Sequence, residues 1–197
     1  MIDVSKATGP AYKVGFRRRR SNLTNYAKRL ALVKGMVPRL VVRKSSKGVL
    51  AQFVEFSAKG DKVLAEARSM QLKEYGWSPR CNSPTAYLCG FLAGKAASKK
   101  GVKEFNLDIG MHTPSKGSLM FAALRGAIDS GLKTNYTTEM ISEDRITGAA
   151  IAAYAKQLKS KDEKAYGRIF SAYVKENFNP ENIVDAFNTA KGRIKNI

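Results

Sequence analysis

Cationic and aromatic side chains alternate near the start of the chain. Tyr12, Lys13 and Phe16 precede a run of four arginines at residues 17–20. Guanidinium groups bind phosphates through paired hydrogen bonds and stack on bases, and aromatic rings offer flat faces to unpaired bases. The segment has too few aliphatic residues to build a core, so we expect it to be disordered until it meets RNA. A solvated basic tail or a localisation signal is the alternative, and the aromatic residues inside the run favour RNA contact.

A polar loop from His112 to Lys116 stands before Gly117, Ser118 and a helical pattern. A lysine beside the N-terminus of a helix can help to bind an anion. Nucleotide-binding loops place Gly before Lys and then Ser or Thr, after a spaced Gly, whereas the order here is Lys-Gly-Ser. We therefore exclude binding of nucleoside triphosphates and keep two equal alternatives for this loop, contact with an RNA phosphate and a plain helix cap.

Residue types that support catalysis are scarce. His112 is the only histidine, and with Cys81 and Cys89 as the only cysteines the usual spacings assemble no four-ligand zinc site. A Ser-His-Asp set would need a nucleophile signature such as Gly-x-Ser-x-Gly, which is missing. Two cysteines cannot staple a fold of this size, and we interpret both as small core residues. The sequence predicts no catalysis, no metal or other cofactor and no small-molecule substrate.

The charge of the chain is strongly positive and unevenly distributed. Its 197 residues carry 35 Lys and Arg against 16 Asp and Glu, a net charge of +19. Residues 1–50 contribute +12, residues 51–134 contribute +5 and residues 135–197 contribute +2. Such a field favours polyanionic partners. Its concentration in the first quarter is typical of a nucleic-acid-binding arm on a globular body.

Membrane and secretory locations fit the sequence poorly. The longest uncharged apolar stretch, residues 82–94, is shorter than the roughly 18 residues that a membrane helix needs. The opening residues contain Asp3 and Lys6 and lack the apolar region of a secretory signal. We expect a cytoplasmic protein without membrane contact.

The residues that follow the arm have the pattern of a helix. Asn22 is its expected cap and Gly35 its expected end. Since one face of this helix is apolar and the other is polar and cationic, either face could pack against the globular body or contact RNA. The apolar face consists of Leu23, Tyr26, Ala27, Leu30 and Val33, and the polar face consists of Thr24, Asn25, Lys28 and Arg29.

The next hundred residues alternate between strand and helix patterns. Two β-branched runs, Arg39–Lys44 and Val49–Phe56, flank turn residues at 45–48 and predict a hairpin. Further along we expect a strand at 62–69, a buried helix at 85–100, a strand at 102–109 and a helix at 117–130. The helix before the fourth strand implies a crossover connection. The fold class is therefore α/β, with a mixed, mainly antiparallel sheet covered by helices.

The pattern after Leu132 is wholly helical. We expect helices from Ser142 to Leu158 and from about Asp162 to Asn177, and a third that Pro180 opens. Their near-neutral charge suits contact with proteins, or a weaker contact with RNA. The predicted domains are a basic arm and helix at 1–36, an α/β core at 37–134 and a helical C-terminal extension at 135–197.

The predicted order of strands is that of a ribonuclease H-like fold, which raises a nuclease hypothesis. Such nucleases hold two metal ions on clustered carboxylates, one of which normally projects from the first strand. The first predicted strand, Arg39–Lys44, contains no acid, and Asp108 ends the fourth without an evident partner. We interpret Asp108 as a capping or surface acid. The nuclease hypothesis therefore ranks below the two hypotheses of RNA or nucleic-acid binding given below.

Short motifs along nearly the whole chain resemble those of one family. They are ATGPAYKV (7–14), FRRRR (16–20), TNY (24–26), PRLVVRKS (38–45), YGW (75–77), AYL (86–88), LDIG (107–110), KGS (116–118), FAAL (121–124) and SEDR (142–145). Together they resemble the universal large-subunit ribosomal protein eighteen family in its archaeal form. After Lys47 the family pattern has an aromatic residue where this chain has Gly48, so no base stacking is carried over to that position.

The resemblance implies a structural, non-catalytic protein that binds 5S rRNA in the central protuberance of the large ribosomal subunit. It also implies contacts with 23S rRNA and with another 5S-binding ribosomal protein. The runner-up hypothesis is a basic protein that binds nucleic acids without sequence or shape preference. The residues expected to face RNA are Tyr12, Lys13, Phe16, Arg17, Arg18, Arg19, Arg20, Asn22, Thr24, Asn25, Tyr26, Lys28, Arg29, Arg39, Arg43, Lys44, Ser45, Ser46, Lys47, His112 and Lys116.

Overall fold

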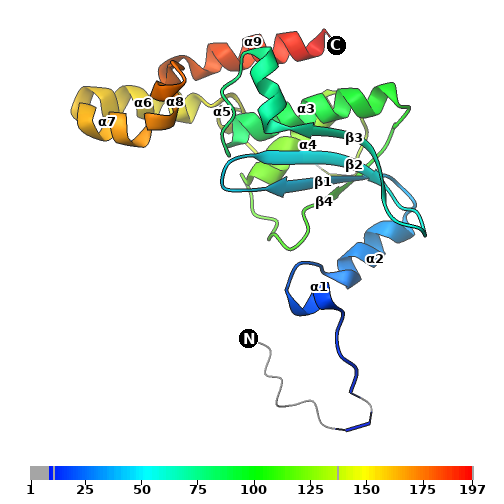
Figure 1. The fold of residues 1–197 in the computed structure, drawn as a ribbon. Helices are drawn as coiled ribbons and strands as arrows, with labels where there is room; N and C mark the ends of the chain where they lie inside the picture. Colours follow the sequence, from blue (N-terminus) through cyan, green and yellow to red (C-terminus); the bar gives the residue numbers. More distant parts are fainter. Residues whose placement is uncertain (1–8, 11, 137, 197) are drawn as a thin grey trace.

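The computed structural model describes residues 9, 10, 12–136 and 138–196. Its centre is a four-stranded sheet in the order β3-β2-β1-β4, shown in Figure 1. Neighbours among the first three strands pair antiparallel, and β4 pairs parallel to β1. The mixed, mainly antiparallel α/β sheet that the sequence predicts is confirmed. The strands are β1 (Arg39–Lys44), β2 (Val49–Glu55), β3 (Lys62–Arg68) and β4 (Asn106–Asp108).

Alternation of side chains along β1 gives the sheet two different faces. Leu40 and Val42 are fully buried, and they lie opposite Phe53 and Ala51 of β2. Two helices, α3 (Ser83–Lys99) and α4 (Leu119–Asp129), cover this face. Successive side chains of a strand point to opposite faces, so the arginines of β1 lie on the face that these helices leave uncovered.

Helices α3 and α4 pack in direct backbone contact. A Cβ atom on Gly90 would lie 2.0 Å from the carbonyl oxygen of Ala123, and one on Gly126 would lie 2.1 Å from that of Tyr87. Only glycine fits at these two positions, and the close approach lets both helices seal the core. The predicted helices at 85–100 and 117–130 are thus confirmed with slightly different ends.

The fourth strand is shorter than the predicted span of 102–109. The amide of Phe105 donates to the carbonyl oxygen of Lys133 at 3.0 Å, and the amide of Lys133 donates to that of Lys103 at 2.9 Å. Residues 103–105 therefore pair with the segment that follows α4 and not with the sheet. Only three residues remain for β4.

The C-terminal helices are more broken than the sequence predicts. Gly148 adopts a φ of 84° and ends the first of them, so the single helix expected from Ser142 to Leu158 is wrong. The expected helix from Asp162 to Asn177 is likewise divided. The observed elements of this part are the 3-10 helices η3 (Thr138–Met140) and η4 (Pro180–Asn182) and the α-helices α5 (Glu143–Thr147), α6 (Ala149–Lys161), α7 (Glu163–Ile169), α8 (Ser171–Lys175) and α9 (Ile183–Lys195). A further 3-10 helix, η2 (Ser69–Tyr75), lies between β3 and α3.

Helix α9 returns to the core. Helices α6, α7 and α8, which we call the C-terminal lobe, project from the body, and α9 runs back along α3 (Figure 1). The ring centroid of Phe187 lies 6.2 Å from that of Trp77 and 5.3 Å from that of Tyr87, and all three side chains are buried. One hydrophobic core therefore continues across residue 134. The division into domains at 36 and 134 stays a prediction.

The two cysteines differ in burial. Cys89 is fully buried in α3, whereas Cys81 is exposed, so the interpretation of Cys81 as a core residue is wrong. Cys81 follows Arg80 in the irregular segment before α3 and points away from the core. Among the helices of the described residues, none combines the length and the apolar character needed to cross a membrane.

Candidate nucleic-acid interface

A groove of about 650 Å³ lies between helix α2 (Tyr26–Lys34) and the uncovered face of the sheet. On the α2 side its wall contains polar and cationic residues together with the apolar residues Leu23, Ala31 and Leu32, and the arginines of β1 form part of its floor. We call it the basic groove and define it by its five cationic side chains, Arg18, Lys28, Arg29, Arg39 and Arg43.

The orientation of α2 makes its polar face the wall of the groove. The Asn25 side chain accepts a hydrogen bond from the Lys28 amide at 3.1 Å and caps the helix, whereas Asn22 has a left-handed φ of 53°. The predicted cap at Asn22 is therefore wrong by three residues. Leu30 is 56% exposed and does not line the groove, whereas Leu23, which is 60% exposed, lines it beside the polar residues.

A chain of ion pairs joins α2 to β1 and β4. The Asp61 Oδ2 atom lies 2.8 Å from Arg29 Nη2 and 2.7 Å from Arg39 Nη2. The Arg39 Nη1 atom also lies 3.1 Å from Asp108 Oδ2. Through these two carboxylates Arg39 links α2 and β4 to the sheet. Because its side chain is only 4% exposed, Arg39 offers little surface to a ligand in the free protein.

Asp108 is a buried centre of this network. Its Oδ1 atom accepts hydrogen bonds from Arg43 Nη2 at 3.2 Å and from the Gly110 amide at 2.8 Å. Its backbone oxygen accepts another from Arg43 Nη1 at 2.9 Å. The interpretation of Asp108 as a surface acid without a partner is therefore wrong, because Arg39 and Arg43 reach it from positions 69 and 65 residues away.

Two cations of the groove keep their charge uncompensated. No carboxylate of the described residues lies within ion-pair distance of Arg18 or Lys28, while Arg29 and Arg43 retain exposed fractions of 41% and 42% in their side chains. The Nε atom of Arg18 donates to the Thr24 hydroxyl at 2.9 Å. These groups give the groove a net positive field that a phosphate backbone could satisfy.

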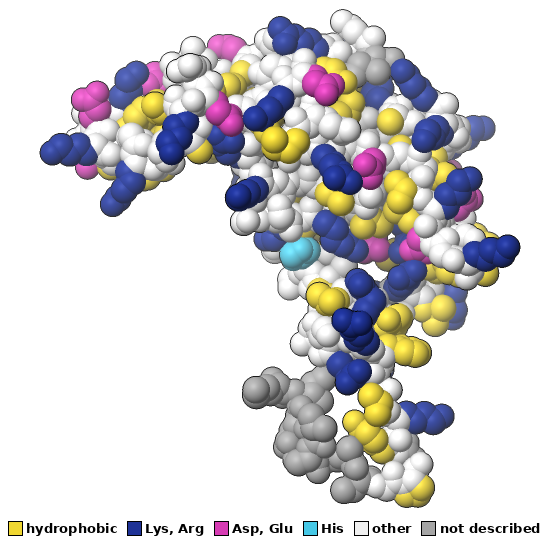
Figure 2. Space-filling view, in the orientation of Figure 1, with side chains coloured by type: hydrophobic (Ala, Val, Ile, Leu, Met, Phe, Trp, Pro, Cys, Tyr) yellow, Lys and Arg dark blue, Asp and Glu magenta, His cyan; other side chains and the backbone are white. Residues whose placement is uncertain are grey.

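The arm continues the groove away from the body. Residues 17–20 form one helical turn, α1 (Arg17–Arg20), and all four arginines are exposed. The ring of Phe16 lies 5.1 Å from that of Tyr26 and is itself 69% exposed, and Tyr12 is 51% exposed. Figure 2 shows Lys and Arg side chains gathered where the arm meets the body, next to apolar side chains. Whether the arm is ordered without RNA stays a prediction.

The β1–β2 turn lies at the other end of the strands from α2 (Figure 1). Lys44 and the turn residues 45–47 are exposed, and the Ser45 hydroxyl accepts from the Gly48 amide at 3.1 Å, closing the turn. A Cβ on Gly48 would lie 2.3 Å from the hydroxyl of Ser69. A larger residue at 48 would therefore displace that hydroxyl, which accounts for the small residue at this position.

The loop from His112 to Lys116 touches the groove only at its edge. Gly110, just before it, packs against the Arg43 guanidinium, and Pro114 lines the groove. His112 is half-buried and Lys116 is exposed. Ser118 stands at the cap position of α4, but its hydroxyl makes no capping hydrogen bond, so the plain helix cap gains no side-chain support.

The structure thus places the predicted residues in four regions, the arm, the β1–β2 turn, the loop and the basic groove. The arm holds Tyr12, Lys13, Phe16, Arg17, Arg19 and Arg20, with Asn22 and Tyr26 beside it, and the turn and the loop hold Lys44 to Lys47, His112 and Lys116. Gln52, Asp61 and Tyr136 also line the groove and were not predicted from the sequence. Alternation along β2 could have placed Gln52 on the same face of the sheet as the arginines. No pattern in the sequence indicated Asp61 or Tyr136. The groove brings together Arg18, Thr24, Asn25, Lys28, Arg29, Arg39 and Arg43.

A metal centre gains no support from the side chains that the structure describes, because no three His, Cys, Asp or Glu residues among them gather at one point. The nearest carboxylates in the groove, Asp61 and Asp108, are both occupied by arginines. The arrangement can bind a polyanion.

Known proteins resemble this chain along nearly its whole length. Residues 10–105 match the family described as "Ribosomal large subunit proteins 60S L5, and 50S L18". The chain is also 44% identical, over 191 residues, to the large ribosomal subunit protein uL18 of Saccharolobus solfataricus, and the alignment covers 96% of each protein. This is a family of structural ribosomal proteins and not of enzymes. The chain therefore belongs to the uL18 family of large-subunit ribosomal proteins, in its archaeal type.

Proposed function

We propose that this protein binds 5S rRNA and attaches it to 23S rRNA in the central protuberance of the large ribosomal subunit. The observation that carries the proposal is the continuity of the exposed arginines of α1 with the basic groove. A folded RNA offers phosphates to the arginines and unpaired bases to Tyr12 and Phe16. As a member of its family the protein works in the cytoplasm as part of the large subunit, among rRNA and ribosomal proteins.

We assign different partners to the two ends of the molecule. The arm and the five cations that define the groove belong to residues 1–50, which have a net charge of +12, and residues 135–197, which include the C-terminal lobe, have a net charge of +2. Phosphate binding gains strength with each neutralised phosphate, so the first part suits 5S rRNA. The lobe suits contact with a neighbouring 5S-binding protein, other proteins of the central protuberance or 23S rRNA.

A ribonuclease H-like topology of the core is part of the proposal, supported by the strand order β3-β2-β1-β4 with a parallel fourth strand. We infer that the protein is nevertheless no nuclease. A catalytic carboxylate needs oxygen atoms available to metal ions, and those of Asp108 accept hydrogen bonds from Arg39, Arg43 and Gly110. Labelled RNA should stay intact when it is incubated with the protein and Mg²⁺.

Competition between RNAs tests the proposed function. The full-length protein is bound to labelled 5S rRNA at physiological salt, and an excess of bulk tRNA is added. A dedicated 5S binder keeps its preference, because shape and unpaired bases add to the phosphate contacts that both RNAs share. If tRNA displaces 5S rRNA on equal terms, the protein binds nucleic acids without preference and the proposal is wrong.

A further inference from the structure

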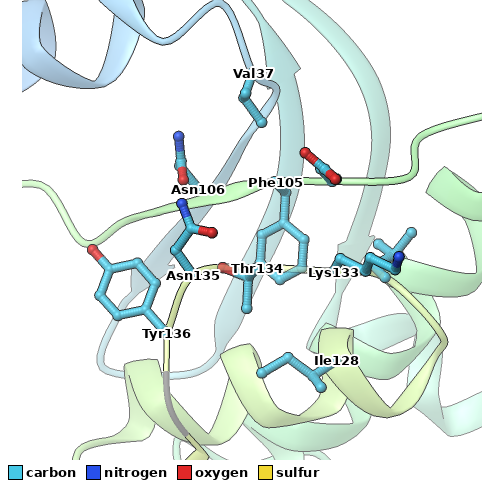
Figure 3. Close-up of a pocket in the computed structure, with 10 residues that line it drawn as sticks. Val37, Phe105, Asn106, Ile128, Lys133, Thr134, Asn135 and Tyr136 are labelled. Atoms are coloured by element: carbon cyan, nitrogen blue, oxygen red, sulfur yellow. The ribbon is translucent and has the colours of Figure 1, made fainter.

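A second cavity, of about 440 Å³, lies beside the basic groove on the outer side of β4. Tyr136 lines both hollows. The wall of the cavity comes from the end of α4, from residues 132–136, from residues 104–106 at the start of β4 and from Val37 before β1, as Figure 3 shows. A molecule that occupies the groove next to Tyr136 therefore lies close to this cavity.

The inner part of the cavity is apolar and rigid. Phe105 and Leu132 are 1% and 3% exposed, and Ile128 is half-buried against the same core. The backbone hydrogen bonds between residues 103–105 and Lys133 hold the two sides of the cavity together. This floor can accept a flat apolar face without rearrangement of the core.

The rim of the cavity is polar. Asn106 and Asn135 bring two carboxamide groups to the side on which the Tyr136 ring stands, opposite Phe105 and Ile128 (Figure 3). The hydroxyl oxygen of Thr134 is buried and has no hydrogen-bond partner among the described residues. A buried hydroxyl without a partner is unfavourable and marks a place where a bound group can supply the missing hydrogen bond. Lys133 and Glu104 add one cation and one carboxylate to the lining, so these two side chains bring no net charge.

We infer that this cavity binds one unpaired nucleobase of the RNA. A base is flat enough to stack on Tyr136, and its edge carries both donors and acceptors, as the two carboxamides require. The neighbouring groove holds the backbone of the same strand, so the base needs to turn by only a short distance. An aliphatic side chain of a protein partner would satisfy the floor and leave Thr134 unpaired. The inference rests on the proposed binding of RNA in the groove.

Cross-linking in native large subunits tests the inference directly. The subunits are irradiated with short-wave ultraviolet light, digested with nuclease and trypsin, and analysed by mass spectrometry. We expect a nucleotide adduct on Tyr136, within the tryptic peptide 134–145. Absence of an adduct from a fully recovered peptide, or a cross-link from Tyr136 to another protein, would overturn the inference.

Binding of variants to 5S rRNA provides the second measurement. Loss of one stacked base weakens binding roughly tenfold, so Tyr136→Ala should bind about tenfold more weakly, while Tyr136→Phe should bind like the natural protein. The control is Tyr154→Ala in α6, because Tyr154 and Tyr136 are 48% and 43% exposed. If Tyr136→Ala binds like this control, the cavity holds no base of 5S rRNA.

The two measurements separate the inference from the proposed function. If the natural protein prefers 5S rRNA but lacks the adduct and the effect of Tyr136→Ala, the inference alone is wrong. If the adduct carries a nucleotide of 23S rRNA, the cavity binds a base as inferred and the assignment of this surface to 5S rRNA is wrong.

Discussion

Arg39 of β1 forms an ion pair with Asp61, and through this carboxylate the sheet is joined to helix α2. The Nη2 and Oδ2 atoms of the pair are 2.7 Å apart, and the same oxygen is shared with Arg29 of α2. The Asp61 carboxylate of the β2–β3 turn therefore positions α2, which forms one wall of the basic groove. Because the helix contributes no fully buried residue of its own, few other contacts can replace this one.

Replacing Asp61 with Asn should loosen α2. Removal of one partner from a buried pair costs roughly 3 to 5 kcal/mol, and we expect less, about 2 kcal/mol, because Arg39 keeps Asp108 and Asp61 is one-quarter exposed. Relative to the natural protein, the variant should show faster hydrogen exchange in α2 and unchanged exchange in α3. Its affinity for 5S rRNA should fall several-fold. Glu66→Gln is the control, since the Glu66 pair with Arg68 is exposed and contributes little. Unchanged exchange in α2 would show that Asp61 does not position the helix.

Replacing Phe187 with Ala should destabilise the whole protein. A large buried aromatic residue contributes about 3 to 5 kcal/mol, and Phe187 is 2% exposed between Trp77 and Tyr87. The midpoint of denaturant unfolding should shift accordingly, whereas Val174→Ala, at a side chain that is 50% exposed, should have little effect.

The same packing changes what a truncation should do. The charge pattern suggests that a chain ending at Leu132 folds and binds 5S rRNA within about tenfold of full length. The structure leads to the opposite expectation, since α9 buries Ile183, Phe187 and Ile194 in the core. A truncated protein that still unfolds cooperatively by circular dichroism would show that the core needs no α9.

Acid should weaken the attachment of the C-terminal lobe. Hydrogen bonds from Ser78 and Arg80 hold the pKa of Glu176 below its ordinary value of 4.5. A carboxyl whose pKa is lower in the folded state stabilises the fold above the ordinary value, and this contribution disappears as the pH falls through the folded-state pKa. Glu176→Gln should therefore reduce the loss of stability between pH 5 and the acid limit, measured as the free energy of unfolding. An identical pH profile for the variant would contradict this role.

The sheet could be predicted because its signals are local. β-branched runs on either side of turn-forming residues indicate β1 and β2, and a stretch of uncharged residues at its start indicates the buried helix α3. The cap of α2 was misplaced because Asn22 and Asn25 are equally good capping residues in sequence, and only the left-handed backbone at Asn22 excludes it. Periodicity cannot choose between two such candidates.

The ion-pair network lay beyond prediction for a different reason. Arg39 meets Asp61 and Asp108 across 22 and 69 residues, and no pattern in the sequence joins residues so far apart. The role of α9 was missed in the same way, because an amphipathic helix shows that it has an apolar face but not which surface covers it. The basic and aromatic composition of residues 12–20 is visible in the sequence because it needs no tertiary contact, and its role in RNA binding stays a prediction.

The salt dependence of 5S rRNA binding by two charge-matched variants tests the central claim most directly. One variant replaces residues 17–20 with Ala, and the other replaces four exposed cations of the C-terminal lobe, Lys156, Lys161, Lys164 and Arg168. Both lose four positive charges, so any difference reports where the phosphates bind. If two to four of the arm arginines neutralise phosphates, the slope of log affinity against log salt should shrink by roughly 2 to 4 units in the first variant and stay unchanged in the second. Equal slopes for both variants would contradict the claim that the arm holds the RNA.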